Sequence, residues 1–569
     1  MSTPSSPATY TVTAALPYAN GPIHIGHLAG VYIPADIYVR YLRGCGHRVL
    51  FVSGSDEHGV PVAIRAQQEG ITPKQVVDKY HALNKKALGD FGICFDIFGR
   101  TSSALHHQTA TRFFKTLHDQ GALEEKETDQ YYDPVQKQFL ADRYIRGTCP
   151  HCGYQEAYGD QCESCGSTLS PEELIQPRST LSGAPLQLKK TKHWYLPLDR
   201  HEAWLRQWLL EEHRDWKTNV YGQCKSWLDQ GLQPRAITRD LDWGVSVPLP
   251  DAKGKVLYVW FDAPIGYISA TQAWAAEHEQ DWRPFWQDQK TQLVHFVGKD
   301  NIVFHCIIFP VMLKAHGNFI LPAQVPASEF LNLEGRKIST SQNWAVWLHD
   351  YLADFPDQQD VLRYVLCSNA PENKDSDFSW QDFQAKNNNE LVAILGNFIN
   401  RTLVLVHKYF GGIVPDREAM TEIEHALATY LQQLPPQIGQ AIAQFKFKEG
   451  LQLCMDLARA GNKYLAETEP WHLIKKDKKQ VGTILNMALQ ITANLAILLR
   501  PFLPATSRRL EEMLGIPPEE ATQWAQAGGI ALVQPETVLQ TPVLLFEKIT
   551  DEVIAAQQQK LRNVREGEG

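Results

Sequence analysis

The sequence predicts an α/β protein in which a doubly wound parallel sheet is split by an insertion and followed by an all-helical bundle. Three observations predict this class. Strand and helix patterns alternate near the N-terminus and return later, a cysteine-rich stretch separates the two blocks, and long amphipathic helices dominate the last third of the chain. With 44% hydrophobic and 21% charged residues, the chain has the balance of a globular protein, which excludes general disorder.

The first block has the order strand, helix, strand, helix. Residues 9–16 are β-branched and apolar and predict a strand, and a Pro/Gly/His turn leads into a helix over about 28–42. A second short apolar run covers 48–52. Thr72 and Pro73 suit the N-cap and the first position of the next helix.

The same alternation returns with a strand over 292–297 and a helix over 302–313. We therefore expect the stretch from 121 to 238 to be an insertion between two halves of one nucleotide-binding sheet. Beyond it, 3.6-residue periodicity predicts long helices, which cover 390–409, 451–466 and 481–499. Low-complexity sequence is confined to the tail of residues 1–7 and the polar end after Gln557, and the chain has no internal repeat.

Composition limits the possible settings of the chain. The formal charge of −9 argues against a general coat for polyanions. The most apolar stretch, 484–499, contains four polar residues and predicts a buried helix without membrane contact. The first cationic residue is Arg40, which disfavours a secretory signal, and six of the ten cysteines are scattered singly. We expect a cytoplasmic protein.

Two histidines lie at the junction of the first strand and helix. His24 and His27 flank Gly26 in the segment 22–27, which reads PIHIGH. Free N–H groups at a helix start attract anions, imidazoles can donate hydrogen bonds to phosphate oxygens, and Gly26 lets a nucleoside approach the backbone. The pattern suits a polyphosphate site, although alone it fits a histidine-filled turn equally well.

A second motif, LEGRKISTS, covers residues 333–341. It places Arg336 and Lys337 in a Gly/Ser-rich loop that could close a cation over pyrophosphate. Alone, such a segment is typical of a solvated surface loop.

Four cysteines have the spacing of a metal site. Cys149, Cys152, Cys162 and Cys165 form two C-x2-C pairs separated by nine residues, and a glycine follows each pair. Four thiolates without an open position predict one structural Zn2+, and four unliganded thiols are the less favoured alternative.

Together, the histidine and loop motifs resemble the HIGH and KMSKS signatures of class I aminoacyl-tRNA synthetases. The runs AALPYANG (14–21) and WFDAPIGY (260–267) are similar to those of methionyl-tRNA synthetases, and the resemblance extends from about residue 10 to 553. It departs from the family loop at Thr340, where a second lysine is usual, and at Ile338, where methionine is usual. Arg336 or a neighbour is then expected to share the balancing of pyrophosphate charge.

The resemblance implies a class I Rossmann-type catalytic domain, split by a zinc-knuckle insertion and followed by an all-α anticodon-binding bundle. The domains it implies are the first Rossmann half (1–120), the connective insertion (121–238), the second Rossmann half (239–328), a stem-contact segment with the KMSKS-like loop (329–383) and the anticodon domain (384–569). The implied catalytic residues are His24, His27 and Lys337. The implied ATP-binding residues are Gly26, Gly298, Asp300, Lys337, Ser339 and Ser341.

The resemblance also implies an aromatic methionine pocket, since apolar and aromatic walls suit a polarizable thioether. Its residues are Leu16, Tyr18, Asp56, Trp260, Pro264, Tyr267, Phe304 and His305. Asp56 is matched to the substrate ammonium, with Glu57 and His58 left as alternatives. Asn397, Arg401 and Trp471 match positions that bind the CAU anticodon, although a tryptophan at a helix end is commonly a packing anchor.

The expected function is a methionine–tRNA ligase that uses ATP with Mg2+, L-methionine and tRNA(Met). Because the chain ends soon after Lys548, without a further module, we expect a monomer. The alternatives are a synthetase for Ile, Val, Leu or Cys, a non-catalytic tRNA-binding relative, and a zinc-dependent nucleic-acid-binding protein. The insertion leaves little room for the editing domain of the branched-chain enzymes.

Overall fold

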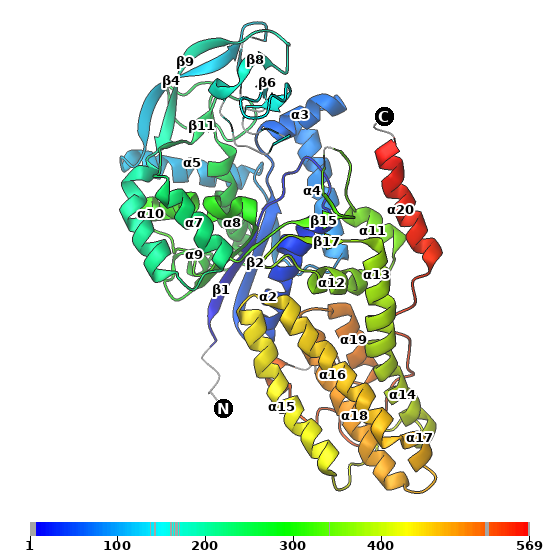
Figure 1. Cartoon of the computed structure of the whole chain (residues 1–569). Coiled ribbons are helices and arrows are strands. Elements are labelled where there is room, and N and C mark those ends of the chain that lie inside the picture. Colours follow the sequence, from blue (N-terminus) through cyan, green and yellow to red (C-terminus); the bar gives the residue numbers. More distant parts are fainter. Residues whose placement is uncertain are drawn as a thin grey trace.

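The structure, a computed structural model, describes residues 7–136, 138–140, 144–159, 162, 164–165, 169, 171–340, 342–517 and 523–566. At its centre is a parallel sheet with the strand order β14-β13-β1-β2-β3 (Figure 1). The strands are β1 (Thr9–Ala14), β2 (Arg48–Ser55), β3 (Ile97–Arg100), β13 (Gln292–Gly298) and β14 (Ala327–Ser328).

The split of the sheet is confirmed by its register. In β1, Tyr10 lies opposite Gln292 of β13, and Thr9 lies opposite Arg48 of β2, both in parallel pairing. The two halves of the chain thus share one sheet across the insertion. The chain winds in opposite directions from β1 and β13, and in such sheets ligands bind beyond the carboxyl ends of the strands at this point.

Helices surround the sheet, and α2 (Ile33–Gly44) and α8 (Val259–Glu277) pack directly on its strands. The others include α1 (Ile25–His27), α4 (Pro73–Asp90), α5 (Ala104–Asp119) and α10 (Phe309–His316). The first helix begins at Ile25, before the predicted start, because His24 caps it. Thr72 caps α4 and forms a capping box with Gln75, which confirms the predicted start of that helix.

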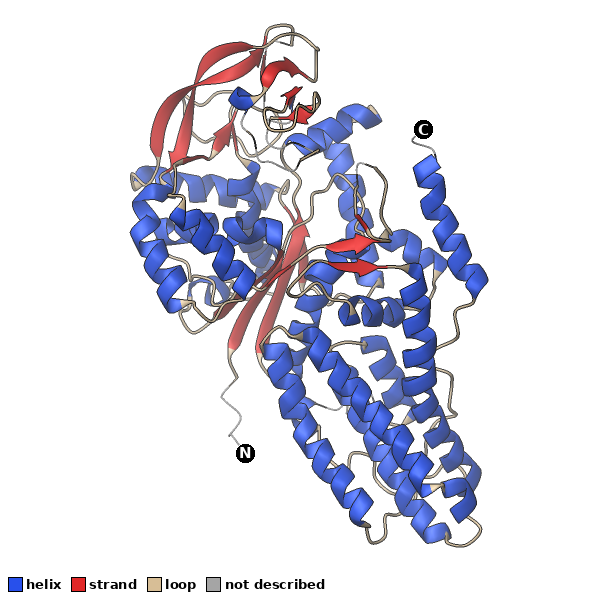
Figure 2. Cartoon of the chain, viewed as in Figure 1, coloured by secondary structure: helices blue, strands red, loops and turns tan. Residues whose placement is uncertain are grey.

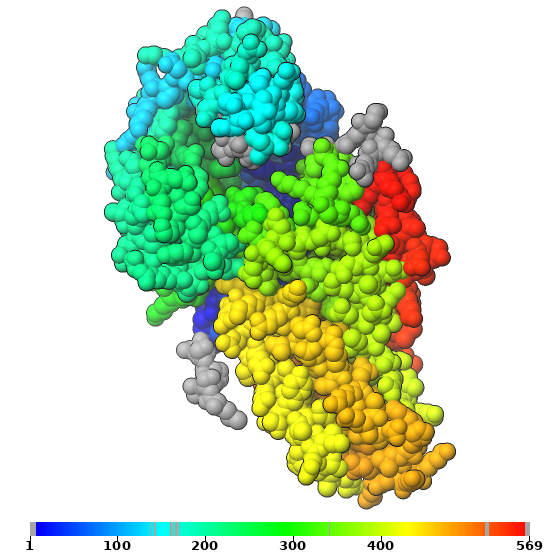
Figure 3. All heavy atoms as spheres, in the orientation of Figure 1, coloured from blue at the N-terminus to red at the C-terminus, as the bar shows by residue number. Residues whose placement is uncertain are grey.

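The insertion forms one end of the molecule and carries most of the remaining strands (Figure 2). Its antiparallel ribbon pairs β4 (Glu124–Asp133) with β9 (Gln187–Leu196). A small sheet beside the ribbon holds the cysteines and consists of β6 (Ile145–Thr148), β7 (Ala157–Tyr158) and β8 (Ile175–Ser179). In the surface view, the N-terminal segments in dark blue are recessed between the insertion in cyan and the later segments in green (Figure 3).

A small sheet leads from the central sheet to the bundle. It contains β15 (Leu331–Leu333), β16 (Arg336–Lys337) and β17 (Ser376–Phe378). The segments α11 (Leu348–Asp354), α12 (Gln359–Ser368) and α13 (Trp380–Lys386) follow along the chain. After a π-helical stretch over Asn387–Gly396, α13 continues into α14 (Asn397–Phe410), which begins the bundle.

The bundle forms the opposite end of the molecule (Figure 1). Its further helices are α15 (Glu422–Ala443), α16 (Phe447–Thr468), α17 (Pro470–Leu473), α18 (Lys478–Leu499) and α19 (Pro504–Met513). Two helical stretches, 380–410 and 478–499, have the length and hydropathy of a membrane span. The apolar window of the second is entirely buried within the chain, which confirms the prediction of a buried helix over 484–499.

The C-terminal region forms a helix that the sequence analysis did not predict. The polar end after Gln557 belongs to α20 (Asp551–Glu566), which contacts α13. Ile554, Gln557 and Leu561 form its buried face, and the Gln557 amide donates to Asp354 at 2.9 Å. Among the side chains that the structure describes, Ile554 and Leu561 are the buried apolar residues of this helix, and their separation of seven positions gives too weak a periodic signal to reveal it.

Candidate functional site

His24 and His27 stack beside each other at the start of α1. Their ring centroids are 3.7 Å apart. Nδ1 of His24 accepts the Gly26 N–H at 3.1 Å, and Nδ1 of His27 accepts the His24 N–H at 3.2 Å. Because both Nδ1 atoms accept backbone hydrogens, each neutral ring carries its proton on Nε2. Burial lowers the pKa of His27 to about 4 and that of His24 well below its usual value, so both rings are neutral donors.

The Lys337 loop lies against this histidine pair. Ile25 N–H donates to the Val346 carbonyl at 3.1 Å, and the His24 ring lies 5.9 Å from the Trp347 ring. A Cβ at Gly26 would lie 3.2 Å from Ile338 Cδ1, so residue 26 has little room for a side chain. The structure therefore brings the two sequence motifs together, although they are far apart in the chain.

Lys337 itself is exposed in the hairpin of β15 and β16. Glu334 and Gly335 form the turn with φ values of 50° and 74°, in the left-handed region that favours glycine. The Lys337 Nζ lies 5.6 Å from the centre of the Phe330 ring, and Lys299 Nζ lies 4.3 Å from the same ring. A second cation thus lies near the hairpin that carries Lys337.

The residues matched to ATP lie around this hairpin and the end of β13. A Cβ at Gly298 would come within 2.5 Å of the Asp300 carboxylate, so this turn favours glycine. Lys299 and Lys337 partly offset the desolvation that raises the pKa of Asp300. Ser339 is paired with Trp344 through backbone hydrogen bonds of 3.0 and 2.9 Å. Ser341 lies outside the described residues.

Asp56 is a buried carboxylate at the end of β2. Its N–H donates to the Pro17 carbonyl at 2.9 Å and its carbonyl accepts the Ala19 N–H at 2.8 Å, which sets Asp56 beside Tyr18. Desolvation, followed by repulsion from Asp262, raises its pKa well above the usual value. Within the described part of the chain, no cation pairs with this carboxylate, so a ligand ammonium would find an uncompensated partner there.

The two neighbours of Asp56, by contrast, already have partners. Both carboxylate oxygens of Glu57 accept hydrogen bonds from Nε of Arg100, at 2.8 and 3.1 Å. His58 Nδ1 lies 2.6 Å from Asp262, whose carboxylate is also 3.6 Å from His106. The geometry therefore favours Asp56, rather than Glu57 or His58, as the partner of a ligand ammonium group.

The aromatic residues of the predicted pocket lie together beside Asp56. Trp260 donates from Nε1 to the Tyr18 hydroxyl at 3.2 Å and lies 5.8 Å from the Phe304 ring. Trp260, Pro264 and Tyr267 share a face of α8 because their spacing is that of neighbouring helical turns. Leu16 packs against α8 at Gly266: a Cβ on residue 266 would lie 3.2 Å from the Leu16 side chain.

Tyr267 and His305 form the buried polar end of this group. His305 Nδ1 donates to the Asn301 carbonyl at 3.1 Å, which leaves Nε2 to accept the Tyr267 hydroxyl at 3.0 Å. Burial lowers the pKa of His305 to about 4 and raises the pKa of Tyr267. Both groups are thus neutral, and the pocket combines aromatic walls with one buried carboxylate, Asp56.

Asp262, His106 and Arg100 are polar residues at the site that sequence reasoning missed. Asp262 pairs with His58, and Arg100 pairs with the Glu57 carboxylate. These two contacts leave Asp56 as the member of the segment 56–58 that has no charged partner among the described residues. The available signal for Asp262 was its place as the one charged residue in the apolar run 260–267. Arg100 gave no local signal, because its partner Glu57 lies far away in the chain, in the turn after β2.

The four cysteines come together in the insertion. All four Sγ atoms lie within 4.8 Å of one another, with Cys149–Cys165 at 3.8 Å and Cys152–Cys162 at 3.6 Å. Thiolates around a tetrahedral zinc with Zn–S near 2.3 Å are separated by about 3.8 Å, so the donor set fits that metal. Gly153 has φ of 75°, as the turn after Cys152 requires, whereas Gly166 lies outside the described residues.

The residues matched to the anticodon lie on the bundle. Asn397 is exposed at the start of α14, and the guanidinium carbon of Arg401 lies 4.9 Å from the centre of the Trp471 ring. Trp471 follows Pro470 at the start of α17, after Glu469 in a left-handed conformation with φ of 43°. The structure thus places an amide, a guanidinium and an indole on one end of the bundle.

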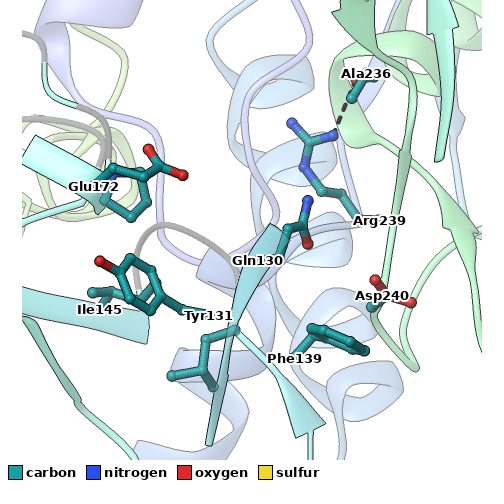
Figure 4. Close-up of a pocket in the computed structure, with 10 residues that line it drawn as sticks. Gln130, Tyr131, Phe139, Ile145, Glu172, Ala236, Arg239 and Asp240 are labelled. Atoms are coloured by element: carbon teal, nitrogen blue, oxygen red, sulfur yellow. Dashed lines mark hydrogen bonds between the residues drawn. The ribbon is translucent and has the colours of Figure 1, made fainter. Parts of the chain in front are cut away.

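A separate pocket of about 110 Å³ lies in the insertion (Figure 4). Its lining includes Tyr131 of the ribbon, Phe139 of the short strand β5 (Gln138–Phe139) beside it, and Arg239, whose guanidinium donates to the Ala236 carbonyl at 3.1 Å. None of the residues matched to ATP, methionine or the anticodon is among those that line it. The pocket is therefore distinct from the group around Asp56.

A parallel sheet of this order, with a histidine pair at its first helix and a lysine hairpin packed against that pair, defines a class I aminoacyl-tRNA synthetase. Comparison with known proteins agrees. Residues 10–403 match the model for tRNA synthetases class I (M), and residues 414–566 match that for the anticodon binding domain of methionyl tRNA ligase. The chain belongs to the methionyl-tRNA synthetase family.

Similar proteins support this assignment. The methionine–tRNA ligase of Cytophaga hutchinsonii is 60% identical over 99% of this chain and 82% of its own length. That of Bacteroides fragilis is 60% identical over 98% and 81%. Among solved structures, Mycobacterium tuberculosis methionyl-tRNA synthetase in complex with methionyl-adenylate has the same fold, with a TM-score of 0.78 over 95% of this chain and 99% of that one at 23% identity.

Proposed function

We propose that the chain is a methionine–tRNA ligase, which activates L-methionine with ATP and transfers the methionyl group to tRNA(Met). The observation that carries the proposal is the buried, uncompensated carboxylate of Asp56 beside the aromatic group of Tyr18, Trp260 and Phe304. An amino acid with an apolar, polarizable side chain supplies both the ammonium for the carboxylate and the surface for the aromatic rings.

In the activation step, a carboxylate oxygen of methionine attacks the α-phosphorus of ATP. The new bond forms as the bond to the bridging oxygen breaks, and pyrophosphate leaves with its electron pair. The Nε2–H groups of His24 and His27 donate to phosphate oxygens as charge builds in the transition state, and Lys337 balances charge on the leaving pyrophosphate. Mg2+ bound with ATP would supply further charge neutralisation.

Asp300 and Gly298 would hold the ribose, and Ser339 would contact the phosphates beside Lys337. Ser341 is proposed to contact the phosphates as well, on the evidence of the sequence alone. Thr340 leaves the loop without the usual second lysine. Lys299 lies near the Lys337 hairpin, but its ammonium is already paired with Glu329 at 2.8 Å and Asp375 at 2.7 Å. Arg336, within the loop itself, is therefore the cation proposed to share the pyrophosphate charge. In the second step, a ribose hydroxyl of the terminal tRNA adenosine attacks the activated carbonyl, and AMP leaves.

Asn397, Arg401 and Trp471 would contact the anticodon at the far end of the bundle. An amide and a guanidinium can bond base edges, and an indole can stack on an unpaired base. We propose one structural Zn2+ on Cys149, Cys152, Cys162 and Cys165. The metal would stabilise the small sheet of the insertion and has no open position for chemistry.

We further propose a cytoplasmic setting, because none of the ten cysteines forms a disulfide. The domain boundaries predicted from the sequence remain part of the proposal. The monomeric state also stays a prediction, which sedimentation velocity would test.

The test of the proposed function is ATP–pyrophosphate exchange with each amino acid, followed by aminoacylation of a tRNA(Met) transcript. Methionine is expected to support exchange, and Ile, Val, Leu and Cys are expected to fail. Exchange with one of those four instead would favour the sister synthetases. Tight tRNA binding without any exchange would favour a non-catalytic relative. A chelator series should unfold the insertion in parallel with loss of one zinc per chain.

A further inference from the structure

A second asparagine, Asn462 of α16, lies beside Asn397 of α14, and its contacts fix which way round both amides lie. We infer that Asn462 is a positioning residue for anticodon specificity: it holds Asn397 so that its oxygen, not its NH2 group, faces the tRNA. The inference rests on the proposed anticodon role of Asn397. It adds the chemical group that Asn397 recognises, an exocyclic amino group on a base.

The first step of the argument concerns Asn462. Its Nδ2 lies 2.8 Å from the carbonyl of Ile394 and 3.2 Å from that of Ala458. Backbone carbonyls only accept, so the atom facing them has to be the NH2 group of Asn462. The opposite orientation would set an amide oxygen against two carbonyl oxygens and lose both hydrogen bonds.

The second step follows for Asn397. Since the NH2 group of Asn462 is occupied, its Oδ1 faces Asn397, and the atom of Asn397 at 3.0 Å is Nδ2. An amide presents its oxygen on the side opposite its nitrogen. Asn397 is exposed, so this oxygen is an acceptor presented to solvent on the bundle face near Arg401 and Trp471.

The close approach of the two helices makes this contact possible. A Cβ at Gly461, the neighbour of Asn462, would come within 2.5 Å of the Phe398 ring. Glycine therefore lets α16 pack directly on Phe398, which follows Asn397 in the chain. The paired positions 461–398 and 462–397 combine one packing contact with one hydrogen bond.

An oriented acceptor distinguishes bases by their Watson–Crick edges. Cytosine and adenine carry exocyclic amino groups, where uracil and guanine carry carbonyl oxygens. Facing Asn397, an amino group gains a hydrogen bond and a carbonyl meets a second acceptor. If the Asn397 amide could rotate by 180°, it would present its oxygen to an amino group or its NH2 group to a carbonyl, and the preference would weaken.

The experiment measures aminoacylation kcat/KM on three tRNA(Met) transcripts, with the anticodons CAU, UAU and CGU. UAU replaces the amino group of the first base by a carbonyl, and CGU does so at the second base. For one of these two changes, Asn462→Leu should lower the preference for CAU by roughly 10-fold, the worth of one oriented hydrogen bond. Lys463→Leu, at the exposed neighbouring position, is the matched control and should keep the native ratios.

Asn397→Asp tests the orientation independently of Asn462 and covers the case in which Asn462→Leu fails to fold, as judged by thermal unfolding. Aspartate can only accept, so it should weaken binding to all transcripts yet keep the preference for the amino-bearing base. A preference inverted toward UAU or CGU would show that the NH2 group of Asn397 faces the base and would overturn the inference.

The two levels of the argument can fail separately. If Asn397→Ala changes kcat/KM for none of the transcripts, the proposed anticodon site is wrong. If Asn397→Ala has a large effect while Asn462→Leu leaves both ratios at their native values, the anticodon site stands and the positioning role of Asn462 is wrong.

Discussion

The site around Asp56 and Lys337 at the carboxyl ends of the sheet strands, called the crevice below, and the bundle face that carries Asn397 differ in one respect. Their polar groups have different partners before a ligand binds. In the crevice, Asp56 is buried without a cation among the described residues, and repulsion from Asp262 adds to the cost of its charge. On the bundle, Asn397 is exposed, and a hydrogen bond from its amide to Asn462 already orients it. A charged group held without a partner favours a ligand that supplies the charge, whereas an oriented amide selects among ligands of similar charge.

The largest effect expected in the crevice comes from Lys337. Lys337→Ala should lower the rate of adenylate formation by roughly 100- to 1000-fold, because a cation that meets charge only in the transition state is removed. The methionine Kd should stay within about twofold, as read from equilibrium binding without ATP. Equal losses in rate and methionine affinity would contradict the role given to the hairpin.

Asp56→Asn should act on the amino acid rather than on the phosphates. We expect kcat/KM for methionine to fall on the order of 100-fold, as for loss of one partner in a desolvated charge pair. The matched control is Glu57→Gln, which removes a carboxylate already bonded to Arg100 and should lower the thermal midpoint more than it changes the methionine KM. If the two variants have interchanged effects, Asp56 is not the ammonium partner.

On the bundle, Trp471→Ala should reduce kcat/KM for tRNA by roughly 10- to 100-fold, the worth of stacking one base. Pyrophosphate exchange needs no tRNA and should be unchanged, which would separate the two regions functionally. His472→Ala, on the same short helix, is the control for local packing. A fall in exchange as large as that in aminoacylation would show that the bundle and the crevice are not independent.

The smallest effect concerns pH. The pKa of His27 is about 4 in the folded chain and near 6.5 when unfolded, so between these values the unfolded state binds more protons. Stability should therefore fall as pH drops through this window. His27→Asn keeps an acceptor near the Nδ1 position and should remove about 1 kcal/mol of this loss at pH 5.5, measured by denaturant unfolding at several pH values. An unchanged pH slope would mean that His27 is not held neutral.

The same two regions show what the sequence can predict. His24, Gly26 and His27 are close in the chain, so a local pattern was enough to predict that they lie at a helix start. Asn397 and Arg401 are one helical turn apart, but their role comes from the family resemblance and stays a prediction. The choice of Asp56 over Glu57 and His58 was not available, because it depends on Arg100 and Asp262. Those residues lie on other elements, and only the folded sheet brings them to the turn after β2.

The fold follows the same rule. Strong sequence patterns predicted the three adjacent strands β13, β1 and β2, the capped helix at Thr72 and the buried helix over 484–499, but not the short outer strands β3 and β14. The helix α20 was missed because, among its described side chains, the buried ones are Ile554 and Leu561 with Gln557 between them. The bond between Asn397 and Asn462 was missed because asparagine pairs on separate helices leave no pattern in the sequence.

The claim that Asp56 waits for an ammonium can be measured as a proton count. Burial and the nearby Asp262 raise the pKa of Asp56 well above its usual value, and an ammonium bound beside the carboxylate should lower that pKa again. Titration calorimetry over a series of pH values, in two buffers of different ionisation enthalpy, should therefore show net proton release on methionine binding to the native chain. Asp56→Asn, titrated at higher methionine concentration, should release fewer protons. Equal proton release by the two proteins would contradict the account.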